Sequence, residues 1–376
     1  MRVFYEVPRV PVHSNLLIAD RAAALAQPAG ALELAVCETC GYIANVAFDL
    51  ALEDYSELYE EAQGFSPRFS RFLDELIDGL IGRYDLAGGR VLEVGCGKGA
   101  FLVALCRRAG CSGVGVDPAY AERDEVDAAG ADVTFVRAFY GPEHAGIPFD
   151  LACCRHTLEH IPAPAEFAAA IHAAAAAHGG ALFVEVPDAG RVLRERAFWD
   201  VYYEHCSYFT AGSLGRLLQA AGLGVTRSEL GYDGQYLLVD SRPGPSAMPP
   251  PDDVAGVVAM ADGFGRDVGL LLAAWRDELA GLRADGRTAV LWGAGSKAVG
   301  FLTGVGDPGA VTHVVDINPY KQGTFLPGTG QEIVAPEALT ALRPDVVVVM
   351  NPIYAEEIGA QLSALGVSTD LRPLSA

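Results

Sequence analysis

Short apolar runs alternate with amphipathic segments through the middle of the chain. From position 90, an apolar run leads into a glycine-rich turn, a helical pattern follows over 100–109, and a second apolar run ends at Asp117. Further apolar runs come at 133–136 and 149–154. Strands that alternate with helices predict a mostly parallel sheet that is covered by helices on both faces. We therefore expect a continuous α/β unit from Arg90 to Asp240.

The flanking segments predict two further parts. Ser66 and Pro67 are typical of a helix start, and this helix should run to about Arg83. Residues 1–54 read as irregular, and the proline-rich stretch 241–253 reads as a linker. A long helix (254–284), a second strand–turn–helix (288–302) and apolar runs at 311–316 and 345–350 then predict a smaller α/β unit. We expect an N-terminal region (1–54), a central domain (55–245) and a C-terminal domain (246–376).

Charge and composition exclude several classes of protein. The chain has 376 residues and a formal net charge of −21, which argues against nucleic acid or an anionic membrane as a partner. Apolar runs of about 18 residues, as a transmembrane helix needs, do not occur, and the first residues lack the apolar core of a signal peptide. A cytoplasmic protein is therefore expected. Five of its eight scattered cysteines lie in or beside apparent core elements and are expected to be reduced, buried thiols: Cys96, Cys106, Cys111, Cys153 and Cys154.

The turn after position 92 carries the strongest candidate chemistry. It reads Glu93-x-Gly95-x-Gly97-x-Gly99, and Asp117 follows 22 positions after Gly95. Glycines let backbone N–H groups approach a ligand at a helix N-terminus, and an acidic residue after the next strand can bind ribose hydroxyls. The spacing differs from the Gly-x-Gly-x-x-Gly of dinucleotide-binding folds. It resembles motif I of class I S-adenosylmethionine (SAM) methyltransferases.

This resemblance implies a fold and a set of cofactor contacts. The fold would be a class I SAM methyltransferase Rossmann-like domain, joined to a smaller C-terminal Rossmann-like α/β domain and a short irregular N-terminal region. Glu93 would contact the amino-acid end of SAM, and the three glycines its methionine and ribose. Ala138 and Phe139 would hold adenine, and the segment 155–161, with His156, would line the methionine pocket. The alternative is a Rossmann-like domain that binds something else or nothing.

A second candidate site follows at 199–210, where Tyr202, Glu204 and His205 crowd together. Histidine titrates near neutral pH and can take a proton from a carbon next to a carbonyl, and a tyrosine hydroxyl can stabilise the enolate. Taken alone, the cluster could equally be a polar loop whose histidine caps or packs.

The wider pattern Tyr-x-Glu-His-x-Ser-Tyr-Phe-Thr resembles the sugar C-methyltransferase family that alkylates nucleotide-linked 4-keto-deoxyhexoses. The resemblance implies that Tyr202, Glu204 and His205 surround the reacting carbon, and that the histidine or the tyrosine acts as base.

The C-terminal third carries a second glycine loop, Gly293-Ala294-Gly295-Ser296-Lys297, with Asp316 after the next strand. This loop, 315–323 and 327–329 resemble the C-terminal domain of the same family. Read without that resemblance, the loop is a loose dinucleotide fingerprint. Lys297, Tyr320 and Lys321 are candidates to meet a substrate phosphate, and solvated surface is the alternative for them.

The N-terminal region departs from the family, whose members carry two Cys-x-x-Cys pairs that bind zinc. This chain has one pair, Cys37 and Cys40, whereas tetrahedral zinc takes four ligands. We therefore expect no metal. His13 is a candidate third ligand, a candidate active-site residue that would bind substrate, or an inert surface histidine.

These patterns together predict a SAM-dependent C-methyltransferase that acts on the carbon alpha to a ketone through His-assisted enolate formation. The expected acceptor is a small molecule, a nucleotide-activated keto-deoxysugar of natural-product (antibiotic) biosynthesis. One alternative is O- or C-methylation of a non-nucleotide intermediate. Others are an NAD-dependent oxidoreductase and a non-catalytic SAM- or sugar-binding module. The oligomeric state stays open.

Overall fold

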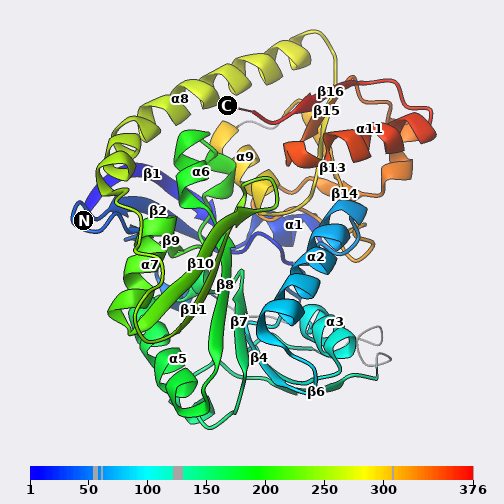
Figure 1. Cartoon of the computed structure of the whole chain (residues 1–376). Coiled ribbons are helices and arrows are strands. Elements are labelled where there is room, and N and C mark those ends of the chain that lie inside the picture. The colour runs from blue at the N-terminus through cyan, green and yellow to red at the C-terminus, as the bar shows by residue number, and fades with distance from the viewer. Residues whose placement is uncertain (54–57, 61, 122–129, 307–308, 376) are drawn as a thin grey trace.

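Three β-sheets organise the protein, and each is built mainly from a different stretch of the chain (Figure 1). The computed structural model describes residues 1–53, 58–60, 62–121, 130–306 and 309–375. The predicted boundary between 54 and 55 lies outside the described residues.

The central sheet has seven strands in the order β10-β11-β8-β7-β4-β5-β6. Five neighbouring strands are parallel, and β11 runs antiparallel to both of its neighbours. Class I SAM methyltransferases have this strand order, with one reversed strand near the edge of a parallel sheet and helices on both faces. The predicted fold is therefore confirmed. The strands are β4 (Arg90–Val94), β5 (Ser112–Val116), β6 (Asp132–Val136), β7 (Leu151–Arg155), β8 (Ala181–Pro187), β10 (Leu223–Gly231) and β11 (Tyr236–Pro243).

Helices cover both faces of this sheet, as the alternating pattern predicts. Along β4, Val91 packs into the core beneath α2 and α3, whereas Leu92 packs into the core beneath α5 and α7. Successive side chains of a strand point to opposite faces, which is why a strand buried on both faces is apolar throughout. These helices are α2 (Pro67–Tyr84), α3 (Ala100–Ala109), α5 (Pro164–His178) and α7 (Ala211–Ala220). The short helix α6 (Ala189–Arg194) follows β8 and packs into a different hydrophobic core.

The N-terminal region is not irregular, which corrects the prediction for 1–54. It forms an antiparallel sheet of β1 (Arg2–Pro11), β2 (Ala29–Val36) and β3 (Ile43–Asn45), beside the short helix α1 (Arg21–Leu25). A fourth strand, β9 (Ser207–Tyr208), comes from the segment that carries the candidate catalytic residues. Pairing of β3 with β9 therefore joins the N-terminal sheet directly to that segment.

The C-terminal sheet has five parallel strands in the order β14-β13-β12-β15-β16. This Rossmann-like arrangement agrees with the second α/β unit predicted from the apolar runs. Its strands and helices are β12 (Ala289–Trp292), α9 (Ser296–Val305), β13 (Val311–Val315), β14 (Glu332–Val334), α10 (Leu339–Leu342), β15 (Val346–Val349), α11 (Ala355–Ala364) and β16 (Asp370–Pro373).

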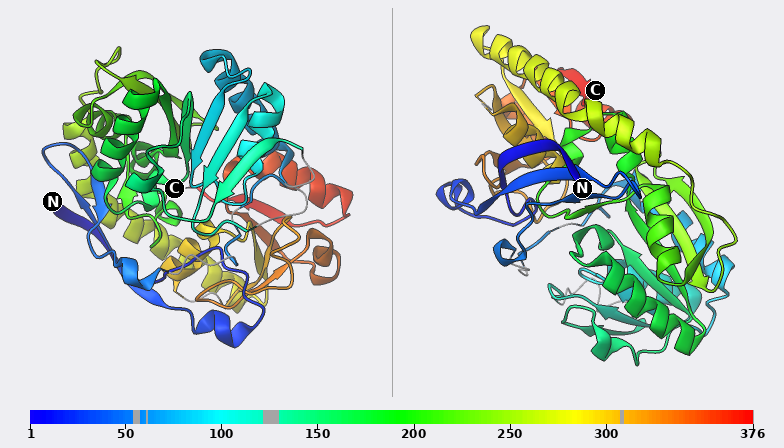
Figure 2. Two further views of the ribbon diagram at one scale, coloured as in Figure 1. Left: turned by 90° about the horizontal axis from the view of Figure 1, so that it is seen from below. Right: turned by 90° about the vertical axis from the view of Figure 1, so that its left-hand side faces the viewer.

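One long helix, α8 (Val254–Ala284), precedes the C-terminal sheet and packs against β1, α6 and α9 (Figures 1 and 2). Its bounds agree with the predicted helix. The predicted linker 241–253 is shorter than expected, because β11 continues to Pro243 through its pairing with β10. Among the described residues, none of the helices has the length and apolar character that crossing a membrane requires.

Candidate active site

The glycine turn between β4 and α3 leaves no room for side chains. Gly95 has a φ of 73°, and a Cβ there would lie 2.0 Å from Oγ1 of Thr157. Gly99 has a φ of 83°, precedes the first residue of α3, and would place a Cβ 2.3 Å from the ring of Phe135. A positive φ and close neighbours both require glycine. Because the turn follows β4, its backbone lies at the carboxyl edge of the sheet.

Asp117 is tied to this turn. Its carboxylate accepts hydrogen bonds from the backbone N–H groups of Gly97 at 2.9 Å and Ala119 at 2.7 Å. Burial raises the pKa of Asp117, and these N–H donors oppose that rise. The structure thus brings together the predicted glycines and the predicted ribose-binding carboxylate.

Glu93 is fully buried on β4, directly before the turn. Burial raises its pKa to about 8, although the neighbouring Arg155 opposes the shift. Within the described residues, its Oε2 has no hydrogen-bond partner. A buried polar atom without a partner is costly, so this carboxyl group suits a ligand that brings a cationic N–H group.

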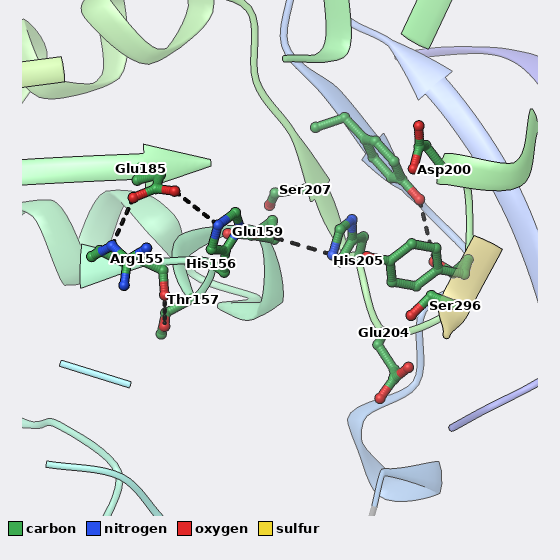
Figure 3. A network of polar contacts seen from close by, with 12 residues as sticks. Arg155, His156, Thr157, Glu159, Glu185, Asp200, Glu204, His205, Ser207 and Ser296 are labelled. Carbon is green, nitrogen blue, oxygen red and sulfur yellow. Dashed lines mark hydrogen bonds and ion pairs between the residues drawn. The ribbon is translucent and has the colours of Figure 1, made fainter. Parts of the chain in front are cut away.

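The other predicted cofactor residues lie beyond the strands that follow. Ala138 is partly buried and packs against the core beside β4, whereas Phe139 is 61 % exposed. His156 places Nε2 3.0 Å from Oε1 of Glu185, and Nε of Arg155 donates to Glu185 at 2.6 Å (Figure 3). Burial opposes protonation of His156, but Glu185 and Glu159 raise its pKa to about 9. The ring is therefore protonated at neutral pH.

His205 lies in the interior, among other titratable side chains. Its Nε2 is 4.0 Å from Oε1 of Glu159 (Figure 3). Its ring centroid is 4.1 Å from that of Tyr202 and 4.8 Å from that of His160. Burial lowers the pKa of His205 well below its usual value, and the nearby His160 lowers it further. The imidazole is therefore neutral at physiological pH, the form in which it can accept a proton.

Glu159 and His160 were missed by sequence reasoning, although they lie in the segment 155–161 that it assigned to the methionine pocket. Both belong to the 3₁₀ turn Leu158–His160, and the side chain of Glu159 is buried with no hydrogen-bond partner among the described residues. With His205 they place ligand atoms within 4.8 Å of one another, a donor set that could hold a divalent metal. Two histidines, His156 and His160, with the acidic Glu159 between them were the sequence signal that could have pointed to these residues.

Tyr202 and Glu204 flank Tyr203 in the sequence, but their side chains lie in different surroundings. Burial raises the pKa of Tyr202 well above its usual value, so its hydroxyl stays protonated and can donate a hydrogen bond. The Glu204 carboxylate points away from His205 (Figure 3) and accepts hydrogen bonds from the backbone N–H, at 3.0 Å, and the hydroxyl of Ser14. Ser14 was not predicted, because it lies 190 residues away in sequence.

His13 is buried, which corrects the expectation of an inert surface histidine. Its Nδ1 lies 3.5 Å from Oε1 of Glu204, so it faces the candidate active site. It is therefore not a third ligand beside Cys37 and Cys40. Within the described part of the chain, these two thiols do not join a group of three or more potential metal ligands.

The three predicted phosphate contacts separate. Lys297, a candidate for a phosphate contact, instead forms an ion pair with the buried carboxylate of Asp200, so it is not a solvated surface cation either. Lys321 is also buried, and its Nζ donates to Oδ1 of Asn15 and to the carbonyl of Ala294, each at 3.0 Å. Tyr320 is 38 % exposed and contacts the ring of Phe65. Of the three, Lys321 lines a small pocket, together with Ser14 and Asn15.

Comparison with known families agrees with this architecture. Residues 64–228 match a methyltransferase domain, and residues 257–368 match the C-methyltransferase C-terminal domain. The chain is also 29% identical over 372 residues to the C-methyltransferase NovU of Streptomyces niveus, which covers 93% of this chain and 86% of that protein. The chain is a SAM-dependent methyltransferase.

Solved structures similar to this methyltransferase include two that each cover 46% of its chain. One is 1,6-didemethyltoxoflavin-N1-methyltransferase of Burkholderia thailandensis, with 20% identity, 78% of that chain covered and a TM-score of 0.36. The other is magnesium protoporphyrin IX methyltransferase of Synechocystis PCC 6803, with 20% identity, 83% of that chain covered and a TM-score of 0.36.

In this methyltransferase, the glycine turn and the candidate catalytic residues are linked by one short segment. Oγ1 of Thr157 donates to the carbonyl of Gly95 at 3.4 Å, and Glu159, two residues later, faces His205. The segment from Thr157 to His160 thus connects the glycine turn to the neutral imidazole.

Proposed function

We propose that this methyltransferase transfers the SAM methyl group to the carbon alpha to a ketone, with His205 as the base. The observation that carries the proposal is the buried, neutral imidazole of His205, which lies beside the turn that contacts Gly95. Orientation of substrate and SAM in one site replaces a bimolecular encounter and supplies a large part of the rate enhancement.

The steps use the residues of the turn at 202–205. His205 takes the proton from the alpha carbon, and the electron pair of that C–H bond moves into the enolate. Tyr202 keeps its proton and donates a hydrogen bond to the enolate oxygen. SAM held at the glycine turn would supply its methyl group to the alpha carbon and would leave as S-adenosylhomocysteine. Imidazolium formed on His205 returns its proton to solvent.

SAM, when bound, supplies the methyl group, and the cofactor residues proposed for it are those predicted from the sequence. Glu93 would meet the ammonium of the methionine, because its buried carboxyl group has an oxygen without a partner in the described residues. Gly95, Gly97, Gly99 and Asp117 would line the methionine and ribose. Ala138, Phe139 and His156 stay predictions, and His156 would act through its contact with Glu185.

The acceptor is proposed to be a nucleotide-activated keto-deoxysugar. The support is the resemblance of the segment 202–210 to the sugar C-methyltransferase family. Lys321 is the better of the two lysines for a phosphate contact, because it lines a pocket beside Ser14, next to the Glu204 carboxylate. Lys297 is held by Asp200 instead.

The test is turnover of a thymidine diphosphate 4-keto-deoxysugar with SAM. In deuterated water without SAM, wild-type protein should exchange the alpha proton; with SAM, the product should gain a methyl group on that carbon. His205→Asn should lose about 10²–10⁴-fold in both reactions, with SAM affinity retained. His178→Asn, at the end of α5, is the matched control.

Methylation on oxygen without exchange would overturn the C-methylation mechanism. Full turnover of His205→Asn would overturn the role of the base. SAM binding without turnover of any nucleotide-linked ketone, together with turnover of a non-nucleotide ketone, would replace the acceptor and keep the reaction.

A further inference from the structure

The second glycine loop has no role in the function proposed above. It resembles the first loop closely, because Ala294 N–H donates to the Asp316 carboxylate at 2.7 Å, just as Gly97 N–H donates to Asp117. The loop leads into α9, whose first residues are Ser296 and Lys297. The side chains of Ser296 and Lys297 point from the start of α9 toward the segment 198–205.

Lys297 forms an ion pair with Asp200, which lies two residues before Tyr202. The carboxylate of Asp200 is buried and also binds the guanidinium of Arg191. Breaking a buried ion pair leaves an uncompensated charge, so such a pair strongly resists separation of its two partners. It therefore fixes the start of the segment that carries the candidate catalytic residues to the first turn of α9.

The rest of α9 packs closely on the same segment. A Cβ added at Gly300 would lie 3.3 Å from the backbone of Trp199, and the rings of Phe301 and Phe198 are stacked with centroids 6.3 Å apart. Positions 297, 300 and 301 lie on one face of a helix because they are three and four residues apart. One face of α9 thus supports the 3₁₀ turn Phe198–Asp200.

Ser296 reaches the other end of the segment. Its Oγ lies 2.7 Å from Oγ of Ser14, and that hydroxyl also binds the carboxylate of Glu204. Asn15 donates a second hydrogen bond to Ser296 at 3.0 Å. Two consecutive residues of α9 therefore contact both ends of the stretch from Asp200 to Glu204, one directly and one through Ser14.

We propose that Ser296 and Lys297 are positioning residues: the first turn of α9 holds the stretch from Asp200 to His205 in the geometry that methyl transfer needs. The glycine loop of the C-terminal domain then places the first turn of α9 against the active site, and it does not bind a dinucleotide. The inference rests on the proposed function for the identity of the catalytic residues. A displacement of about 1 Å at such residues can cost about 10²-fold in rate.

Lys297→Met is the sharpest test, because Asp200 keeps Arg191 as a counterion in this variant. The expected result is a kcat for the thymidine diphosphate 4-keto-deoxysugar that is about 10–100-fold lower, with SAM affinity within about twofold of wild type. Lys297→Arg should restore most of the rate. Asp200→Asn/Lys297→Met should be little worse than the worse single variant, because partners in one pair are not additive.

A second readout needs no substrate. The imidazole resonances of His205, followed by NMR of histidine-labelled protein, should shift in Lys297→Met and return in Lys297→Arg. They should stay unchanged in Gly269→Ala, which alters an exposed position of α8 with open space around it. Gly300→Ala provides a steric variant that leaves every charge in place and should shift the same resonances, even if Lys297→Met fails to fold.

Three results would overturn the proposal. Lys297→Met with wild-type kcat and wild-type His205 resonances would remove the positioning role. A rise in KM with unchanged kcat would assign Lys297 to substrate binding. Unchanged His205 resonances in Gly300→Ala would separate α9 from the catalytic segment. If wild-type protein does not methylate the keto-sugar, the proposed acceptor fails, whereas the His205 resonances still test the positioning.

Discussion

The backbone N–H of Ser14 donates a 3.0 Å hydrogen bond to the carboxylate of Glu204, and the hydroxyl of the same serine binds the same oxygen. This contact joins the segment after β1 to the turn before β9, two parts of the chain that also meet through the pairing of β3 with β9. With His13 at 3.5 Å, Glu204 has three donor groups on the N-terminal region. The N-terminal region is thus a structural component of the candidate active site.

Ser14→Ala should therefore impair catalysis while leaving the fold intact. The variant keeps the backbone N–H bond and loses the hydroxyl bond, which for a charged acceptor stabilises by about 1.5–3 kcal/mol. Carried into the transition state, that loss corresponds to about a 10–100-fold fall in kcat/KM. Steady-state kinetics with SAM titration measure it, and Ser70→Ala, on the exposed side of α2, is a control. A wild-type rate would remove Ser14 from the site.

The pH profile should report the lowered pKa of His205. Because burial favours the neutral imidazole, the base is available at neutral pH and is lost only as pH falls through a pKa below the usual value of about 6.5. The acid limb of kcat/KM for the acceptor, measured with SAM at saturation so that Glu93 does not contribute, should therefore lie below that value. His160→Asn removes a group that lowers the pKa of His205, so its acid limb should move toward higher pH. A limb at or above 6.5 in the wild type would contradict this assignment.

Local sequence signals anticipated much of the fold. The bounds of α3 and α8 agree with their predicted helices, and Ser66 caps α2 with Pro67 at its first position. These features depend on neighbours in sequence, such as the N-cap hydrogen bond. The sheet β1–β2–β3 was missed because Pro8 interrupts β1 and because bulges at Val3/Tyr5 and Val7/Val10 break its alternation of inward and outward side chains.

In the candidate site, too, the residues that are neighbours in sequence could be predicted, whereas their distant contacts could not. Tyr202, Glu204 and His205 share one short turn, so a pattern in sequence could find them. Ser14 contacts Glu204, Glu159 faces His205, and Lys297 pairs with Asp200 of the same segment. These three residues come from distant parts of the chain, and only the tertiary fold brings them to the turn. Lys297 illustrates the limit: a lysine after a glycine loop suggests phosphate, whereas the fold places it against a buried carboxylate.

Glu93 should make SAM binding proton-linked. Its buried carboxyl group has a pKa of about 8, so it is mostly protonated at pH 7 without ligand. Contact with the methionine ammonium would favour the ionised form and release a proton on binding. Calorimetry in buffers of different ionisation enthalpy should show this release near pH 7, and Glu93→Gln should abolish it and weaken SAM binding. Equal binding enthalpies in all buffers would exclude the contact.

Protonation of Glu93 also predicts how stability depends on pH. Its folded pKa lies above the unfolded value of about 4.5, so folding takes up a proton between these two pH values. Stability should therefore decline as pH rises from about 4.5 to 8 through this group. Melting temperatures of wild type and Glu93→Gln should converge at low pH and separate in favour of the variant toward pH 8, and a constant difference would contradict the raised pKa.

Gly95→Ala should abolish SAM binding for a steric reason that a paired variant isolates. A Cβ at Gly95 would approach Oγ1 of Thr157 to 2.0 Å, whereas a Cβ at Gly110, which also has a positive φ (64°), would have nothing within 4 Å. Gly110→Ala should therefore cost only the backbone strain of about 1–2 kcal/mol and keep SAM affinity. Gly95→Ala adds the clash and displaces the segment that leads to Glu159. Titration of both variants with SAM measures the difference, and retention of wild-type affinity by Gly95→Ala would show that the turn does not bind the cofactor.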